Sequence, residues 1–165
     1  RTPWWKNLGR IFSRPGEHIL LYYTEINYLI MTTKLNSVLL IDDDEPTNFI
    51  AKMIVTKANL NNTTEAIQSS VKALEFLADD KLAHCDIPDL IFLDINMPTM
   101  NGWEFLEEYK KLEIHNKKKI VLYMLTTSMN DDDQIRSEKI DHVDGFLIKP
   151  LTLKTYTNIV NKHFI

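Results

Sequence analysis

The stretch Leu90-Ile91-Phe92-Leu93-Asp94 decides the fold class of this chain of 165 residues. It is apolar without alternation, a pattern typical of a strand that is buried on both faces of a parallel sheet. Other apolar runs also stop on polar side chains: Ser37–Ile41 on Asp42 and Asp43, Ile120–Leu125 on Thr126, and Gly145–Ile148 on Lys149. Because parallel strands bring their carboxyl ends to one edge of a sheet, we expect these polar side chains to meet in one pocket.

Helix-like segments alternate with these runs and with a weaker strand at Thr63–Ile67. The predicted helices begin at about Thr47, Ser70, Gly102, Asp131–Asp133 and Thr152. The side chains that they should bury are Phe49, Ile50, Met53, Ile54, Val71, Leu74, Leu77, Trp103, Leu106, Tyr109, Leu153, Tyr156, Ile159 and Val160. The pattern is (βα)5, which predicts an α/β fold with a doubly wound, five-stranded parallel sheet and helices on both faces.

The polar residues at the strand ends suit phosphoryl chemistry. The carboxylates of Asp42, Asp43 and Asp94 would repel one another at neutral pH, and a hard cation such as Mg²⁺ would relieve that repulsion. A carboxylate that ends a stiff buried strand can accept a phosphoryl group covalently, which makes Asp94 the candidate. Lys149 could neutralise the incoming phosphate, and Thr126 could donate a hydrogen bond to it. Any one of these residues alone would be explained as a helix cap, but their combination indicates a site.

Composition and charge narrow the possible functions. The net charge of −4 argues against nucleic acid as a partner, and no apolar stretch reaches the roughly 20 residues of a membrane span. The single cysteine, Cys85, excludes an intramolecular disulfide and fits a reducing, cytoplasmic environment. His84-Cys85 has no second pair at zinc-ligand spacing, so we expect a loop there. The chain also has no glycine-rich motif that would cradle a nucleotide.

The first 34 residues differ from the rest of the chain. Trp4-Trp5-Lys6 and the basic residues that follow show no sustained period, whereas Met31 lies where a natural start would be expected. We therefore expect residues 1–34 to be an extension, either upstream of the natural start or loosely docked, and 35–165 to be the folded domain. A basic-aromatic membrane anchor is the alternative, but the charged and aromatic side chains do not separate onto two helical faces.

Residues 35–165 resemble the response-regulator receiver domains of two-component signalling. The resemblance rests on Val38–Glu45, Leu90–Pro98 with Asn101-Gly102, Leu125-Thr126 and Gly145–Pro150, in that order. It implies a flavodoxin-like strand order 2-1-3-4-5 and a signalling role rather than an enzyme. It also implies that Mg²⁺ is the cofactor.

The resemblance assigns a role to each residue of the pocket. Asp94 would be the phospho-acceptor. Mg²⁺ would be bound directly by Asp43 and Asp94, through water by Asp42, and by the backbone carbonyl of Asn96. Asn96 and Ser128 would flank the route of the water that removes the phosphoryl group.

The same resemblance implies a conformational switch beside the pocket. Thr126 and Phe146 would form the switch pair, in which the hydroxyl turns toward the phosphate and the ring turns inward. Lys149 would pair with the phosphoryl group, and its bond to Pro150 is expected to be cis.

The implied partners are a sensor histidine kinase or histidine phosphotransfer protein, and a downstream target protein. Because the chain ends soon after the last predicted helix, we expect a stand-alone receiver, active in a phosphorelay or through phosphorylation-dependent binding. One alternative is a receiver-fold docking module without phosphorylation, which would have no use for crowded carboxylates. The other is a haloacid-dehalogenase-like phosphatase, which needs a late acidic metal ligand, although no Asp or Glu follows Lys149.

Overall fold

The computed structural model describes residues 34–79, 81–84, 86–114, 118–127 and 142–165. The chain divides into two units, 1–34 and 35–165, and the elements below belong to the second. The predicted helix at Asp131–Asp133, the expected extension up to residue 33, and residues Cys85 and Ser128 lie outside the described residues.

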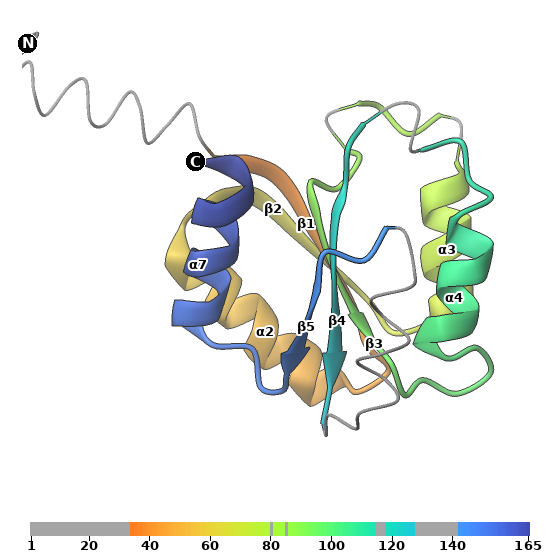
Figure 1. Ribbon diagram of the computed structural model, residues 1–165, viewed down its shortest axis with the longest axis horizontal. Coiled ribbons are helices and arrows are strands. Elements are labelled where there is room, and N and C mark those ends of the chain that lie inside the picture. The colour runs from red at the N-terminus through yellow and green to blue at the C-terminus, as the bar shows by residue number, and fades with distance from the viewer. Residues whose placement is uncertain (1–33, 80, 85, 115–117, 128–141) are drawn as a thin grey trace, which may run out of the picture. The chain divides into compact units, whose positions relative to one another are not determined.

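A parallel sheet of five strands in the order β2-β1-β3-β4-β5 forms the centre of the domain (Figure 1). Every neighbouring pair of these strands is parallel, so all five carboxyl ends lie at one edge. The strands are β1 (Leu35–Ile41), β2 (Asn61–Ile67), β3 (Leu90–Asp94), β4 (Val121–Thr126) and β5 (Gly145–Ile148). The doubly wound sheet and the strand order implied by the resemblance are both confirmed.

Helices cover both faces of the sheet, with α2 and α7 on one face and α3 and α4 on the other (Figure 1). Their bounds are α2 (Glu45–Ala58), α3 (Ser70–Ala78), α4 (Gly102–Tyr109) and α7 (Leu153–Phe164). Each begins after a residue whose side chain accepts a backbone N–H of the first turn: Asp44, Ser69, Asn101 and Thr152. Such caps satisfy N–H groups that have no partner within the helix.

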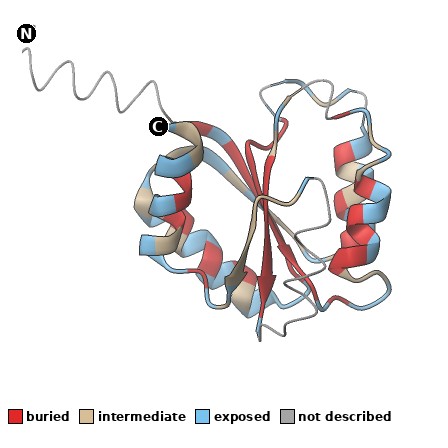
Figure 2. Ribbon diagram, in the orientation of Figure 1, coloured by how far each residue is buried: buried red, intermediate tan, exposed pale blue. Residues whose placement is uncertain are grey.

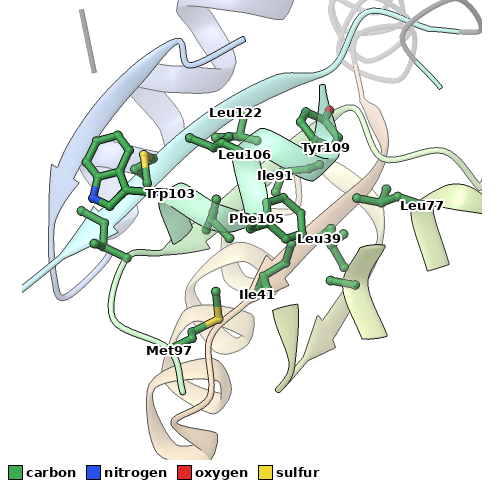
Figure 3. Packing of buried hydrophobic residues seen from close by; sticks show 14 of the residues in the cluster. Leu39, Ile41, Leu77, Ile91, Met97, Trp103, Phe105, Leu106, Tyr109 and Leu122 are labelled. Carbon is green, nitrogen blue, oxygen red and sulfur yellow. The ribbon is translucent and has the colours of Figure 1, made fainter. Parts of the chain in front are cut away.

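Both faces of strand β3 are covered by helices, which explains why its apolar sequence does not alternate with polar residues. Leu90 and Phe92 point into the apolar cluster beneath α2 and α7, whereas Ile91 and Leu93 point into the cluster beneath α3 and α4. All five residues of the strand are buried (Figure 2), and Figure 3 shows Ile91 within the cluster beneath α3 and α4. The strand is thus fixed from both sides, and it holds Asp94 at its carboxyl end.

The predicted buried face of α2 was wrong. Phe49, Ile50 and Met53 are 64%, 51% and 57% exposed, whereas Asn48, Ala51 and Val55 are buried. The stripe at 48, 51 and 55 faces the sheet, because Asn48 donates to the backbone carbonyl of Asp42 and because Ala51 and Val55 pack in an apolar cluster with β1 and β3. The sequence prediction followed apolar content and missed the hydrogen bond that Asn48 makes on the buried side.

The buried face was also misjudged at the beginning of two other helices. Val71 and Leu153 are exposed, at 37% and 40%. In α3 the stripe of Ser70, Ala73 and Leu77 faces the sheet, which leaves Val71 to one side. Before α7, Leu151 fills the apolar position instead. The predicted burial of Leu77, Trp103, Leu106, Tyr109, Tyr156, Ile159 and Val160 is confirmed.

Candidate functional site

The carboxyl edge of the sheet carries the polar residues that the sequence singled out. Asp94 is the last residue of β3, Thr126 is the last residue of β4, Asp42 follows β1, and Lys149 follows β5. The side chains of Asp42, Asp94 and Thr126 are buried, whereas Asp43 is exposed. The edge therefore combines two carboxylates and a hydroxyl held in the protein interior with one carboxylate that faces solvent.

The ammonium group of Lys149 bridges two of these carboxylates. Its Nζ lies 2.6 Å from Oδ2 of Asp42 and 2.9 Å from Oδ1 of Asp94. All three side chains are largely removed from water, since their exposed fractions are 13%, 3% and 4%. Charge-assisted contacts of this length are strong and fix the groups relative to one another.

Burial and charge act in opposite directions on the pKa values of this group. Burial raises the pKa of Asp42, and the hydrogen bond from Lys149 offsets only part of that rise. Burial acts to lower the pKa of Lys149, but its hydrogen bonds to Asp42 and Asp94 outweigh burial and leave that pKa raised. Lys149 is therefore protonated at neutral pH and available to balance negative charge.

Asp42, Asp43 and Asp94 form a group that fits a divalent cation. Each offers a carboxylate oxygen, and these oxygens lie within 4.8 Å of one another. Two oxygens on opposite sides of one Mg²⁺ are separated by about 4 Å, so the group needs little adjustment to share an ion. Three carboxylates beside one ammonium leave an excess of two negative charges, which a divalent ion would neutralise.

A polar side chain that the sequence prediction missed holds the loop between β1 and α2. Nδ2 of Asn48 donates to the backbone carbonyl of Asp42 over 2.7 Å, within the protein interior. Oδ1 of Asp42 accepts the backbone N–H of Asp44, and Asp44 caps α2. The signal in the sequence was a polar residue at helical spacing with Ala51 and Val55.

The loop after Asp94 returns tightly to the end of β3. The backbone N–H of Gly102 donates to the carbonyl of Ile95 over 2.8 Å. A Cβ atom at position 102 would lie only 2.6 Å from the carbonyl oxygen of Asp94. Asn101 and Glu104 form a reciprocal capping box that starts α4 at this point. Glycine is required here because the first turn of α4 rests on the backbone of Asp94.

The remaining predicted site residues occupy the strands next to the pocket and the loop after Asp94. Phe146 lies opposite Met124 in the β4–β5 pair and is partly buried, with its ring against that of Trp103. Asn96 is exposed in the loop that follows Asp94. The Lys149–Pro150 bond is cis, as expected from the sequence.

Comparisons with known proteins identify the family. The model of the response regulator receiver domain matches residues 38–161. This chain belongs to the response regulator receiver domain family.

Individual relatives agree with this assignment. The chain is 29% identical over 124 residues to the response regulator Rcp1 of Synechocystis. The aligned region covers 74% of this chain and 82% of Rcp1. A two-component response regulator of Cytophaga hutchinsonii superposes with a TM-score of 0.72 and 35% identity, over 78% of this chain and 96% of the other. A receiver protein of Dyadobacter fermentans gives a TM-score of 0.66 and 26% identity, over 76% and 95% of the two chains.

Among the residues that the structure describes, no helix combines the length and apolar character needed to cross a membrane.

Proposed function

We propose that this protein is a response regulator that accepts a phosphoryl group on Asp94. The donor would be a phosphohistidine of a sensor histidine kinase or a histidine phosphotransfer protein. The observation that carries the proposal is the position of Asp94 at the end of β3, 2.9 Å from Lys149 Nζ and within 4.8 Å of two other carboxylates. Family membership supports the same role.

Phosphoryl transfer would require an oxygen of Asp94 to form the new bond to phosphorus. The bond between phosphorus and the donor imidazole nitrogen breaks, and the imidazole leaves with the bonding electrons and takes up a proton. Lys149 balances the negative charge of the phosphoryl oxygens, and Thr126 donates a hydrogen bond to one of them. Water later hydrolyses the acyl phosphate, which restores the carboxylate and releases inorganic phosphate.

The residues of the pocket also define how a metal would be held. Asp43 and Asp94 would bind Mg²⁺ directly, Asp42 through water, and Asn96 through its backbone carbonyl. When bound, Mg²⁺ would spread the charge of the phosphoryl group during transfer.

The signal would leave the pocket through Thr126 and Phe146. A phosphoryl group on Asp94 attracts the hydroxyl of Thr126, and the Phe146 ring moves to the inward position. Phosphorylation thereby shifts the population between two existing conformations rather than creating a new one. A downstream target, or the next protein of a relay, would bind one of the two conformations.

The stand-alone arrangement and the cytoplasmic location stay predictions. The match covers about four-fifths of some curated relatives, such as Rcp1, but less than half of others, such as NarL of Escherichia coli. The competing function is docking without phosphorylation, and labelling of Asp94 distinguishes the two functions.

The test is labelling of the full chain with a radioactive small phosphodonor in the presence of Mg²⁺. We expect the parent to be labelled and Asp94→Asn to be unlabelled. Asp44→Asn is the matched control, because it removes a neighbouring exposed carboxylate while asparagine caps a helix as well as aspartate does. Equal labelling of parent and Asp94→Asn would exclude Asp94 as the acceptor, and an unlabelled parent would favour the docking module.

A further inference from the structure

Trp103 contacts the ring that the proposed function uses as its switch. The ring centroids of Trp103 and Phe146 lie 5.8 Å apart with an interplanar angle of 32°. Trp103 is buried, whereas Phe146 is partly buried against the same cluster. In Figure 3 the indole lies at the edge of this cluster, and the ring contact places it beside β5. The conformation of Phe146 seen here therefore rests on an aromatic neighbour from a different element.

Trp103 is also joined to strand β3, through Gly102. It is the second residue of α4, and the residue before it, Gly102, is the one whose position allows no side chain against the carbonyl oxygen of Asp94. The N–H of Trp103 is held by Oδ1 of Asn101 over 2.9 Å. The first turn of α4 thus touches the backbone of Asp94 at one residue and the ring of Phe146 at the next.

We infer that Trp103 is a positioning residue for Phe146, and that through Gly102 it couples the position of this ring to the backbone of Asp94. The inference rests on the proposed function of Asp94 and adds a structural determinant of its regulation. Gly102 places Trp103 beside the backbone of Asp94, and Oδ1 of Asn101 accepts the N–H of Trp103. When Phe146 moves inward, its ring changes its contact with Trp103.

The size of the effect follows from the contact. Aromatic pairs at this separation contribute enough to change the ratio of two populations by roughly 2- to 12-fold. A contact between two residues amounts to coupling only when the contact has two alternative arrangements. The experiment therefore has to detect the Trp103–Phe146 contact both before and after phosphorylation.

The contact itself is tested by a double-mutant cycle that needs no phosphorylation. The parent, Trp103→Leu, Phe146→Leu and the double variant are unfolded with urea as full chains. We expect the unfolding constants to deviate from additivity by about 2- to 12-fold. Trp103→Phe keeps a ring at this position and remains available if the leucine variant does not fold, and it should retain most of the coupling. Additive effects would overturn the inference.

The coupling is tested by the emission of Trp103. The chain has three tryptophans, so replacing Trp4 and Trp5 by phenylalanine leaves Trp103 as the only one. Acetyl phosphate with Mg²⁺ should change its emission in parallel with the label on Asp94. In Phe146→Leu the label should persist while the emission change falls at least severalfold.

Phe105→Leu is the matched control for this measurement. Phe105 lies on the same helix, is buried, and stacks on Tyr109 at a similar centroid distance of 5.7 Å. It should preserve the emission change. Label without an emission change, or an emission change that survives in Phe146→Leu, would overturn the inference while leaving the proposed function intact. An absence of label would contradict the proposed function, and the inference would fall with it.

Discussion

Replacing Gly102 by alanine should damage both the stability and the phosphorylation of this domain. The added Cβ would lie 2.6 Å from the carbonyl oxygen of Asp94 and 3.0 Å from the Cα of Ile95, and both are backbone atoms. Side-chain Cβ atoms essentially never approach closer than 3.0 Å, so the first turn of α4 and the backbone of Asp94 must separate by at least 0.4 Å. Neither partner is the flexible end of a side chain that could rotate away.

The energetic cost can be bounded from this overlap. Overpacking a well-packed site costs about 1–3 kcal/mol, and the better helix propensity of alanine returns about 1 kcal/mol. We therefore expect urea denaturation to show a loss of up to about 2 kcal/mol. Because a misplacement of 1 Å at a reacting group can cost about 100-fold in rate, a shift of this size should slow labelling of Asp94 about 3- to 10-fold.

Gly145→Ala is the matched control for this prediction. Its Cβ would also meet a neighbour at 2.6 Å, but that neighbour is the ring of Tyr123 in β4. Gly145 begins β5 and lies in register with Tyr123 and Phe92 rather than with Asp94. It should lose stability and keep the parent rate of labelling when both proteins are fully folded. Equal labelling rates for Gly102→Ala and Gly145→Ala would refute the claim that α4 positions the acceptor through its backbone.

Three further changes test other parts of the structure. Asn48→Ala should lower the free energy of unfolding in urea by about 1–2 kcal/mol, because it leaves the buried carbonyl of Asp42 without the Asn48 donor. The control is Asn158→Ala, at an exposed position, which should cost little. Equal losses in the two variants would contradict the stabilising role of the Asn48 hydrogen bond. Thr99→Gly should stabilise the protein by about 1 kcal/mol in urea denaturation, since Thr99 has a φ of 69° and β-branched residues are strained there. A destabilised variant would show that the contacts of the Thr99 side chain outweigh this backbone strain. Burial lowers the pKa of His163, whose ring contacts the Tyr123 hydroxyl. Because the unfolded chain then binds a proton at a higher pH than the folded one, the free energy of unfolding should fall as pH drops below about 6.5. A dependence of this free energy on pH that is unchanged in His163→Phe would exclude His163 as its origin.

Much of the fold followed from the strand sequences alone. The unbroken apolar run at Leu90–Leu93 indicated a strand covered on both sides, and the alternation of strands with helix-like segments predicted a parallel, doubly wound sheet. The positions of Asp42, Asp94, Thr126 and Lys149 at one edge then follow from the direction of the strands. The strand order came from the resemblance rather than from any residue pattern.

The orientation of α2 could not be deduced from apolar content. Its most apolar side chains, Phe49, Ile50 and Met53, face outward, and the inward stripe contains Asn48. A polar residue in the core is stable only when its hydrogen bond is made, and that bond goes to the carbonyl of Asp42, which lies outside the helix. Local sequence contains the residue but not the position of its partner.

The contacts made by Gly102 and Trp103 were hidden for a similar reason. The sequence predicted that Gly102 opens a helix and that Trp103 is buried, and both are confirmed. The approach of Gly102 to the backbone of Asp94 and the contact between Trp103 and Phe146 depend on how α4 packs against β3 and β5. Such tertiary distances are not encoded in spacing along one segment.

The position of the phosphoryl group can be determined directly. Borohydride reduces an aspartyl phosphate to homoserine, and the modified residue can be located by mass spectrometry of the digested protein. After treatment with acetyl phosphate and Mg²⁺, homoserine should be found at position 94 and should disappear when EDTA replaces Mg²⁺. Homoserine at Asp42 or Asp43, or a yield at position 94 that does not depend on Mg²⁺, would contradict the role assigned to Asp94 and its neighbouring carboxylates.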